Sequence, residues 1–336
     1  MEFDNKNGIN VLSVFDGISA GMIALEKAGI KVNNYYASEI DKYAIKVSNS
    51  NWKDKVIHIG DIKKIKYRKG ILYTENGNFN IGKIDLLIGG SPCQSFSNLG
   101  DQSGLDGKSG LFYEYLRIKK LLKPSEFLFE NVGMRKAFKD QLSKFLKCEP
   151  IEINSNLVSA QNRKRLYWTS LNVGELQNRN IFLSDIIDFQ VDEKYFLSDK
   201  AKKYIINKDR IKKKLIEFST DKSLCLLARY RGLSGTFICI DNNGKFDKEK
   251  SGTLTQRYYK GVSTFGSDTY VLDGEDITKE RIRMFTPEEC EKLQTVPVGY
   301  TKSVSDTQRY KMLGNGWTVD VIAHIFSYLP EEWKLR

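Results

Sequence analysis

The sequence lacks any apolar run long enough to cross a membrane, for which roughly 20 uncharged residues are needed. It also lacks an apolar leader, because the first stretch, "MEFDNKNGIN", is polar and carries two acidic residues, unlike a secretory signal or transit peptide. We therefore expect a soluble, cytoplasmic protein. With 336 residues, 40% of them hydrophobic, the chain can bury one large core or two smaller ones.

Cysteine is scarce, and its five positions include no C-x-x-C pair. An odd number of isolated cysteines predicts neither a disulfide framework nor a zinc site, so we expect no metal. Cys93 has an unusual setting, in "GGSPCQSFS" (89–97), a glycine-flanked turn just after the apolar run "IDLLI" (84–88). A buried cysteine normally packs among apolar residues, so this turn suggests either chance or a chemical role.

Acidic residues are outnumbered by basic ones, and the formal net charge is +11. A strongly basic chain favours a polyanionic partner. The segment 200–215 concentrates this charge, with eight Lys or Arg residues against one Asp. It is either a solvated helix face or a surface that contacts such a partner.

Short apolar strands alternate with helical patterns in the first half of the chain. This alternation indicates βαβ units and an α/β fold with a doubly wound, mostly parallel, Rossmann-like sheet. Ligands bind such sheets at the carboxyl ends of the strands, where the Pro-Cys turn lies. The expected strands are 9–15, 33–38, 55–59, 84–89, 126–131 and 150–158, and the expected helices 22–29, 41–49, 110–122 and 134–147.

After about residue 172 the pattern changes to short strand-like pieces broken by turns, which predicts a second, smaller, loop-rich and β-leaning domain. Helical character returns near Pro287, where a proline and acidic residues suit a first helical turn. The apolar segment 318–329 predicts a last helix that packs back on the first domain. We expect three parts, which are 1–173, 174–282 and 283–336.

Loops after the first three strands carry candidate ligand contacts. "FDGISAG" (15–21) joins a strand to a helix, and its glycines allow close approach of a ligand, although it is not G-x-G-x-x-G. Glu39 ends the second strand, where an acid can bind ribose hydroxyls. Asp61 follows the third strand and can reach an exocyclic amine of adenine. Either acid can instead be a helix N-cap or a surface charge.

Later strands add an acid and two arginines. Glu130 in "FLFENV" follows an apolar strand, where a carboxylate is costly unless it is paired or functional. In "QNRKRLYW" (161–168), Arg163 and Arg165 share one face of an extended segment, because side chains alternate with period two. A thiol, a partly buried acid and two arginines suit attack on an electron-poor ring whose nitrogen becomes protonated.

These motifs, taken in order, resemble those of the DNA (cytosine-5)-methyltransferase family over nearly the whole chain. The endings "GNGW" and "LQTVPVGYT" are more similar to the eukaryotic de novo branch and to phage-type relatives than to bacterial enzymes ending in Gly-Asn-Ser. The Lys-, Ile- and Asn-rich composition, with no accessory reader domain, suits a stand-alone bacterial or phage enzyme. The stretches that carry the resemblance are "VFDGISAG", "ASEID", "GDI", "GGSPCQSFS", "FENV", "QNRKR", "RMFTPEECEKLQTVPVGYT" and "RYKMLGNGWTVDVIAHI".

The resemblance implies that Cys93 adds to carbon 6 of a flipped-out cytosine and that the methyl group comes from S-adenosyl-L-methionine. It further implies that Glu130 holds the base at its ring nitrogen and amino group, that Arg165 contacts the carbonyl oxygen of the base, and that Arg163 supports the site. The cofactor contacts that it implies are Phe15, Gly17, Ile18, Gly21, Glu39, Ile40, Asp61, Ile62, Pro92, Leu111, Asn315 and Trp317.

The same resemblance implies duplex DNA as substrate, with 174–282 as the target-recognition domain. It also allows a cognate restriction endonuclease as a partner, and we expect a monomer. The alternatives are a tRNA cytosine-5 methyltransferase and a non-catalytic regulatory homologue. "Cys-Phe-Thr", seen in the tRNA-methylating branch, does not occur in the recognition region. The expected DNA contacts are Gln94, Ser97, Arg229, Arg231, Gln256 and Arg257.

Overall fold

A computed structural model describes residues 8–92, 110–199, 216–217, 235–240, 268–273 and 281–335. The chain divides into two compact units, and each is described by itself. The first unit contains Met1–Ile153, Lys164–Leu176 and Val319–Arg336, and the second contains Asn154–Arg163 and Gln177–Thr318.

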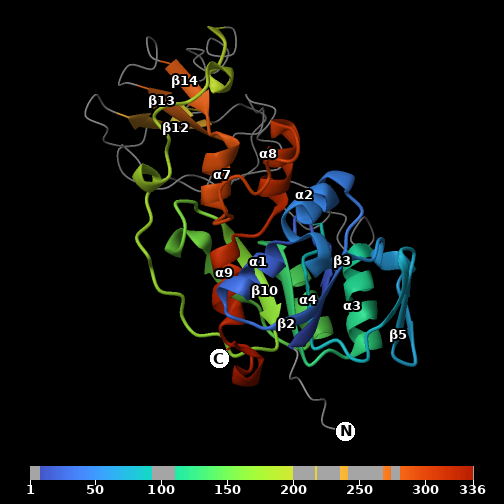
Figure 1. The fold of residues 1–336 in the computed structure, drawn as a ribbon. Coiled ribbons are helices and arrows are strands. Elements are labelled where there is room, and N and C mark those ends of the chain that lie inside the picture. The colour runs from blue at the N-terminus through green and yellow to red at the C-terminus, as the bar shows by residue number, and fades with distance from the viewer. Residues whose placement is uncertain are drawn as a thin grey trace. The chain divides into compact units, whose positions relative to one another are not determined.

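Among the described residues, the largest sheet has seven strands in the order β3-β2-β1-β7-β8-β10-β9 (Figure 1). The neighbours from β3 to β8 run parallel, whereas β10 runs antiparallel to β8. The expected α/β fold with a mostly parallel sheet is therefore confirmed. The strands are β1 (Ile9–Val14), β2 (Val32–Ser38), β3 (Val56–His58), β7 (Leu86–Gly89), β8 (Glu126–Val132), β9 (Ile151–Asn154) and β10 (Lys164–Thr169).

The strand order reverses between β1 and β7, because the chain builds β2 and β3 on one side of β1 and then returns to the other side. Ligands bind at such a switch point in open α/β sheets. Val14 and Gly89 are paired there, at the ends of the two strands. A Cβ atom on Gly89 would lie 2.7 Å from the carbonyl oxygen of Val14. Only glycine therefore fits at this position, directly before the Pro-Cys turn.

Helices α3 (Gly110–Leu122) and α4 (Lys136–Leu146) cover one side of the core of this sheet. The ring centroids of Phe112 and Tyr115 on α3 lie 5.2 and 4.8 Å from that of Phe129 on β8. These buried aromatic contacts anchor α3 to the strand that carries Glu130 and Asn131 and ends at Val132.

Helices α1 (Ala20–Lys27) and α9 (Val319–Phe326) pack on each other (Figure 1). Nζ of Lys27 lies 2.6 Å from Oδ1 of Asp320 and joins the two helices by an ion pair. Helix α2 (Lys42–Trp52) follows β2, and the carboxylate of Asp41 caps it by accepting the backbone N–H of Tyr43.

Between β3 and β7 the chain forms a small antiparallel sheet that the sequence did not predict. Its strands are paired in the order β4-β5-β6. They are short and consist mostly of exposed and partly buried residues, so they lack the apolar runs by which the buried strands were recognised. The strands are β4 (Lys66–Arg68), β5 (Ile71–Thr74) and β6 (Gly77–Asn80).

Strand β9 is shorter than the predicted stretch 150–158 because the chain turns at Asn154. The Asn154 side chain accepts the backbone N–H groups of Asn156 and Arg163. A 3₁₀ turn over Ser155–Leu157 follows directly. An asparagine that binds nearby backbone groups competes with continuation of a strand, which accounts for the early end.

The second unit contains a four-stranded sheet in the order β11-β12-β13-β14 and the helices α7 and α8. The predicted helix near Pro287 is present as α7. Its first turn is closed by a capping box, in which Thr286 and Glu289 each bind the backbone N–H of the other. The elements are β11 (Ile216–Glu217), β12 (Gly235–Ile240), β13 (Asp268–Asp273), β14 (Arg281–Met284), α7 (Pro287–Leu293) and α8 (Asp306–Asn315).

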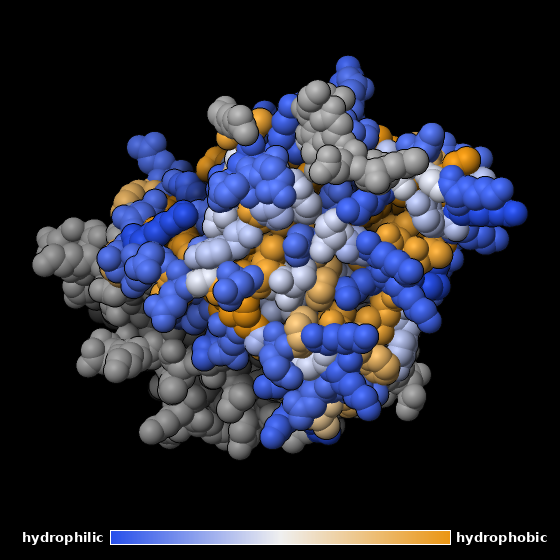
Figure 2. Space-filling model, turned by 90° about the horizontal axis from the view of Figure 1, so that it is seen from below, coloured by the Kyte–Doolittle hydropathy of each residue, from blue (hydrophilic) through white to orange (hydrophobic). Residues whose placement is uncertain are grey.

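Within the described part of the chain, no helix is long and apolar enough to cross a membrane. Figure 2 shows the face that is seen from below relative to Figure 1. Hydrophilic side chains there are interspersed with hydrophobic ones.

Candidate active site

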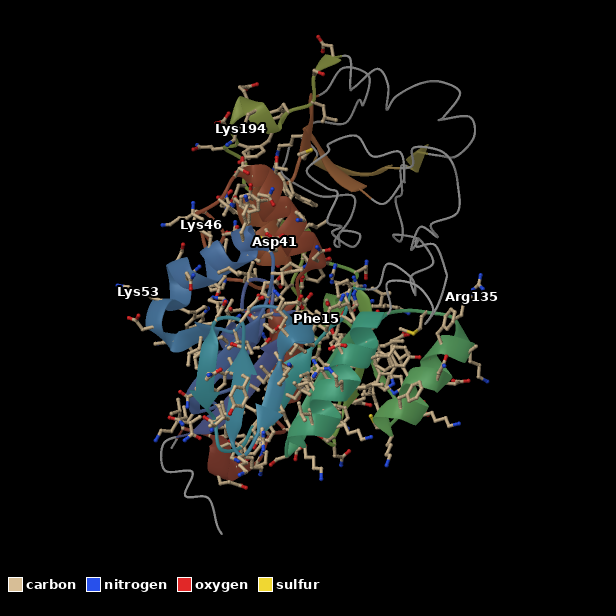
Figure 3. The ribbon with its side chains drawn as sticks, turned by 90° about the vertical axis from the view of Figure 1, so that its right-hand side faces the viewer. Phe15, Asp41, Lys46, Lys53, Arg135 and Lys194 are labelled. Carbon is tan, nitrogen blue, oxygen red and sulfur yellow. The ribbon has the colours of Figure 1, made fainter. Side chains whose placement is uncertain are left out.

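The loop after β1 has a strained backbone. Phe15 and Ser19 have φ angles of 58° and 60°, in the left-handed region that side chains other than glycine seldom adopt. Gly17, between them, has a φ of 61° and open space where a Cβ atom would lie. Figure 3 shows Phe15 at the end of the sheet from which this loop emerges. Strained loops of this kind cluster at ligand sites, and the cofactor role of Phe15 and Gly17 stays a prediction.

Asp16, which the sequence reasoning missed, is buried beneath this loop. Its carboxylate accepts hydrogen bonds from the hydroxyl groups of Ser19, at 2.6 Å, and Tyr35, at 2.7 Å. Burial raises the pKa of Asp16 from 3.8 to about 6, against the lowering effect of hydrogen bonds from Ser13, Ser19 and Tyr35. Its place in "FDGISAG", an acid directly after an apolar strand, was the sequence signal that could have identified it.

Glu39 organises the loop that follows β2. Its carboxylate accepts three backbone N–H groups, from Gly17 at 2.8 Å, Ile40 at 2.7 Å and Asp41 at 2.8 Å. The acid therefore joins the loops after β1 and β2. Ile40 follows with 74% of its surface exposed, which is unusual for a large apolar side chain.

Asp61 and Ile62 follow β3. One carboxylate oxygen of Asp61 accepts the N–H of Lys63 at 2.9 Å, so Asp61 caps the 3₁₀ turn Ile62–Lys64. An N-cap was one of the two alternatives to a ligand contact that the sequence left open for this acid. The side chain of Ile62 is only 3% exposed and belongs to the hydrophobic core. A contact between Ile62 and a cofactor stays a prediction. The side chain of Ile18 is also buried, and Gly21 is a buried residue of α1.

Glu130 and Arg165 meet across the antiparallel pair of β8 and β10. The Nε atom of Arg165 lies 3.3 Å from Oε1 of Glu130, and the two side chains are 14% and 13% exposed. In the ladder, Arg165 is opposite Val132 and Tyr167 is opposite Glu130, so the ion pair is a diagonal one. Its partial burial keeps the pair less screened than a surface salt bridge.

Two polar groups beyond the paired ends of β7 and β8 are buried without a hydrogen-bond partner, namely Oγ of Ser91 and Nδ2 of Asn131. Both residues follow the last paired position of β7 and β8, where Gly89 is opposite Phe129. Buried polar groups without a partner are costly and uncommon outside functional sites. Pro92, next to Ser91, is exposed, and Leu111 in the first turn of α3 is half-buried.

Arg163 belongs to the second unit and is 3% exposed. Its guanidinium donates hydrogen bonds to the carbonyl oxygens of Gly314, at 3.1 Å, and Gly316, at 2.9 Å. It therefore holds the backbone on both sides of Asn315, which is exposed. Trp317, which follows Gly316, is half-buried. β10 begins only at Lys164, so Arg163 precedes the strand on which Arg165 lies.

Several predicted site residues lie outside the described residues. They are Cys93, Gln94, Ser97, Arg229, Arg231, Gln256 and Arg257. The described residues contain no cluster of three His, Cys, Asp or Glu side chains that could hold a metal ion.

Residues 9–331 match the family model of C-5 cytosine-specific DNA methylases. The chain belongs to this family. It is thus a DNA (cytosine-5-)-methyltransferase, and its family uses S-adenosyl-L-methionine as the methyl donor.

Curated relatives of this methyltransferase include the type II methyltransferase M1.ScrFI of Lactococcus lactis subsp. cremoris, which is 30% identical over 98% of this chain and 80% of its own length. The type II methyltransferase M.SsoII of Shigella sonnei is 29% identical over 95% and 79%. The orphan methyltransferase M.SPRI of Bacillus phage SPR is 25% identical over 96% and 97%.

Solved structures resemble the methyltransferase in fold. The Entamoeba histolytica methyltransferase EhMeth superposes with a TM-score of 0.71 at 18% identity, over 98% of this chain and all of its own. The S. pombe methyltransferase Dnmt2 gives a TM-score of 0.67 at 19% identity, over 96% and 99%. At these identities the likeness establishes the fold alone.

Proposed function

We propose that the methyltransferase modifies carbon 5 of a cytosine flipped out of a specific duplex DNA sequence, with Cys93 as the covalent nucleophile. The observation that carries the proposal is the Glu130–Arg165 ion pair at the end of β8. Gly89, which leads into the Pro-Cys turn, ends the neighbouring strand β7. Parallel neighbours end at the same edge of a sheet, so the turn begins beside the ion pair. The target carbon is inaccessible in a stacked duplex, hence the need for flipping.

The cytosine chemistry assigns a task to each side chain. The thiolate of Cys93 forms a bond to carbon 6, because only the deprotonated sulfur is a strong nucleophile. As the thiolate adds, a proton passes from the carboxyl group of Glu130 to the ring nitrogen, and Glu130 accepts a hydrogen bond from the amino group, while Arg165 donates to the carbonyl oxygen. Carbon 5 then gains a methyl group, and loss of its proton breaks the C–S bond and releases the thiolate, while the proton on the ring nitrogen returns to Glu130.

The residues at the ends of β1, β2 and β3 fit an adenosine-containing cofactor. Exposed Ile40 offers an apolar surface for a ring face, and it lies next to the carboxylate of Glu39, which can accept from ribose hydroxyls. The second carboxylate oxygen of Asp61 can accept from an exocyclic amine. S-adenosyl-L-methionine, when bound, supplies the methyl group. Phe15, Gly17 and Leu111 are proposed as further contacts, together with Ile18, Gly21, Ile62, Pro92, Asn315 and Trp317.

The proposal for the remaining parts follows the family. Residues 174–282 select the DNA sequence, and Gln94 and Ser97 contact DNA beside Cys93. A cognate restriction endonuclease acting on the same site, a monomeric state and a cytoplasmic location are proposed as well. The curated relatives named as type II methyltransferases support the restriction-modification setting.

A duplex that carries 5-fluorocytosine tests the proposal, because fluorine at carbon 5 prevents proton loss and traps the covalent adduct. We expect an adduct that survives denaturing gel electrophoresis with the wild-type enzyme and S-adenosyl-L-methionine. Cys93→Ser should give no adduct, since a serine hydroxyl is far weaker as a nucleophile without a strong base. Cys148→Ser is the matched control, because Cys148 is a half-buried free thiol and should not affect the reaction.

Two results would contradict the proposal. One is an adduct with Cys93→Ser, which would move the nucleophile elsewhere. The other is methylation of a tRNA transcript but not of duplex DNA in parallel reactions, which would favour the RNA alternative.

A further inference from the structure

The turn between β5 and β6 reaches back to the loop on which Asp61 lies. The carboxylate of Glu75 accepts the backbone N–H of Asp61 at 3.0 Å, and Nδ2 of Asn76 donates to the carbonyl oxygen of His58 at 3.0 Å. His58 is the last residue of β3, so both side chains of the turn hold the chain at the point where it leaves the sheet.

The side chain of Glu75 packs directly against Gly60. Gly60 has a φ of 80°, and a Cβ atom there would lie 2.3 Å from Oε1 of Glu75. Its carbonyl oxygen accepts the hydroxyl of Ser38 at 2.7 Å. Ser38 directly precedes Glu39, so the loops after β2 and β3 are joined through one hydrogen bond.

Arg117 on α3 holds the other end of the same loop. Its Nη2 donates to the carbonyl oxygen of Ile62 at 2.8 Å, and its Nη1 donates to that of Ile65 at 2.9 Å. Glu114, one turn earlier on α3, accepts from Nε of Arg117 at 2.8 Å and fixes the guanidinium.

We propose that Glu75 and Arg117 are positioning residues for the cofactor, which act by holding Asp61 where it meets the adenine. This rests on the proposed role of Asp61. The turn supplies an acceptor for the N–H of Asp61, so the carboxylate of Asp61 keeps one oxygen on Lys63 and directs the other outward. Without the contacts from Glu75 and Arg117, part of the free energy of cofactor binding is spent on ordering the loop that carries Asp61, and affinity falls.

Glu75 also forms an ion pair with Lys64, and this interaction lowers the pKa of Glu75. The pair allows an alternative in which Glu75 only neutralises an exposed lysine. Exposed ion pairs contribute little, whereas loss of an acceptor leaves the N–H of Asp61 without its partner. Three substitutions separate the two roles. Glu75→Gln keeps an oxygen acceptor and loses the ion pair, Glu75→Leu loses both, and Lys64→Gln loses only the ion pair.

The test measures the affinity of each purified full-length variant for S-adenosyl-L-homocysteine by calorimetry, together with kcat and KM for S-adenosyl-L-methionine on duplex DNA. We expect Glu75→Leu and Arg117→Gln to weaken binding and raise KM about three- to tenfold, with kcat within about twofold of wild type. Glu75→Gln and Lys64→Gln should stay within about twofold of wild type in both measurements.

Unchanged affinity in Glu75→Leu, with a wild type that binds, would overturn the positioning role and leave the proposed function intact. Equal losses in Glu75→Leu, Glu75→Gln and Lys64→Gln would assign the effect to the ion pair and also overturn it. If the wild type itself does not bind S-adenosyl-L-homocysteine, the proposed cofactor site is wrong and this inference with it. Thermal melting identifies any variant whose loss reflects unfolding, and Asp61→Asn, combined with Glu75→Leu, then tests for non-additive losses.

Discussion

The Nε atom of Arg165 lies 3.3 Å from Oε1 of Glu130. The two residues lie on the antiparallel strands β10 and β8. The neighbouring strand β7 ends at Gly89, where the chain enters the Pro-Cys turn. The ion pair is diagonal and partly buried, which fixes two groups of opposite charge at one distance. Arg165 contacts Oε1 of Glu130, and in the proposed role Glu130 shares a proton with the ring nitrogen of the base, because a neutral ring nitrogen only accepts hydrogen bonds. The pair is thus suited to hold a base at two of its edges.

Glu130→Gln should reduce turnover on duplex DNA by about 100- to 10,000-fold, because proton sharing with the ring nitrogen is lost while the side-chain shape is kept. DNA affinity should change only a few-fold. Single-turnover methyl transfer and DNA binding measure the two quantities. Glu126→Gln is the control, since Glu126 begins the same strand at its opposite end. A turnover of Glu130→Gln within a few-fold of wild type would rule out the role.

Arg163→Lys should mainly lower stability, whereas Arg165→Lys should mainly lower turnover. Nη2 of Arg163 donates to both carbonyl oxygens, and a lysine at 163 is shorter and lacks the planar group that places this atom, so we expect the free energy of unfolding to fall by about 1.5–3 kcal/mol. A lysine at 165 should leave stability nearly unchanged and lower turnover, because its proposed partner is the base. Urea unfolding and steady-state kinetics measure the two. The same profile for both variants would contradict the separate roles.

The sequence predicted the central strands because their apolar runs are unambiguous, and β1, β2 and β7 lie where they were expected. Alternation with period two could not tell that β10 starts at Lys164, so Arg163 and Arg165 were treated alike. Their different partners depend on Gly314, Gly316 and Glu130, which lie far away in the sequence. Tertiary partners of this kind cannot be read from local spacing.

Glu39 and Asp61 were recognised as important from their places after β2 and β3. Their hydrogen bonds to Gly17, Lys63 and other backbone groups could not be predicted, because the loops that supply them are held by tertiary contacts. The acceptor for the N–H of Asp61 is Glu75, in the turn between β5 and β6, and the small sheet to which these strands belong has no strong sequence signal. Local patterns therefore identified the chemistry, and packing decided how it is held.

Asp16→Asn should stabilise the protein above neutral pH. An acid whose pKa is raised in the folded state, here from 3.8 to about 6, binds its proton more tightly there than in the unfolded chain. Stability therefore falls as the pH rises from about 4 to about 6, and the full loss persists at higher pH. An amide accepts one of the two hydroxyl groups through its oxygen and donates an N–H to the other, and it avoids the charge, so we expect a gain of up to about 3 kcal/mol at pH 8.

The pH dependence is the sharper test of this prediction. The advantage of Asp16→Asn over wild type in urea unfolding should grow by about 1–2 kcal/mol between pH 5 and pH 8. Parallel stability curves for the two proteins would mean that Asp16 is not a charged, buried group. Lower activity in a more stable Asp16→Asn would indicate that the strained loop after β1 uses this charge.

The choice of DNA sequence is expected to depend on Arg229, Arg231, Gln256 and Arg257, which lie outside the described residues. They occur in "LARYRG" and "SGTLTQRYYKG", where long hydrogen-bond donors stand beside glycines and tyrosines, and Thr253-Leu254 resembles a dipeptide of the family's recognition region. Arginine reads guanine through two parallel hydrogen bonds, and a good pair gives roughly 1–3 kcal/mol of discrimination. A residue that contacts only phosphate weakens all sequences alike.

Methylation of a randomised duplex library by each alanine variant distinguishes base readers from phosphate contacts. A base reader changed to alanine should relax the choice at one position, and a phosphate contact should lower activity uniformly and flatten its salt dependence. We expect at least one of the four variants to relax a single position. Lys46→Ala, at an exposed position of α2, provides a control for general charge loss. If all four variants lose activity uniformly with an unchanged preference, the base readers lie elsewhere between residues 174 and 280.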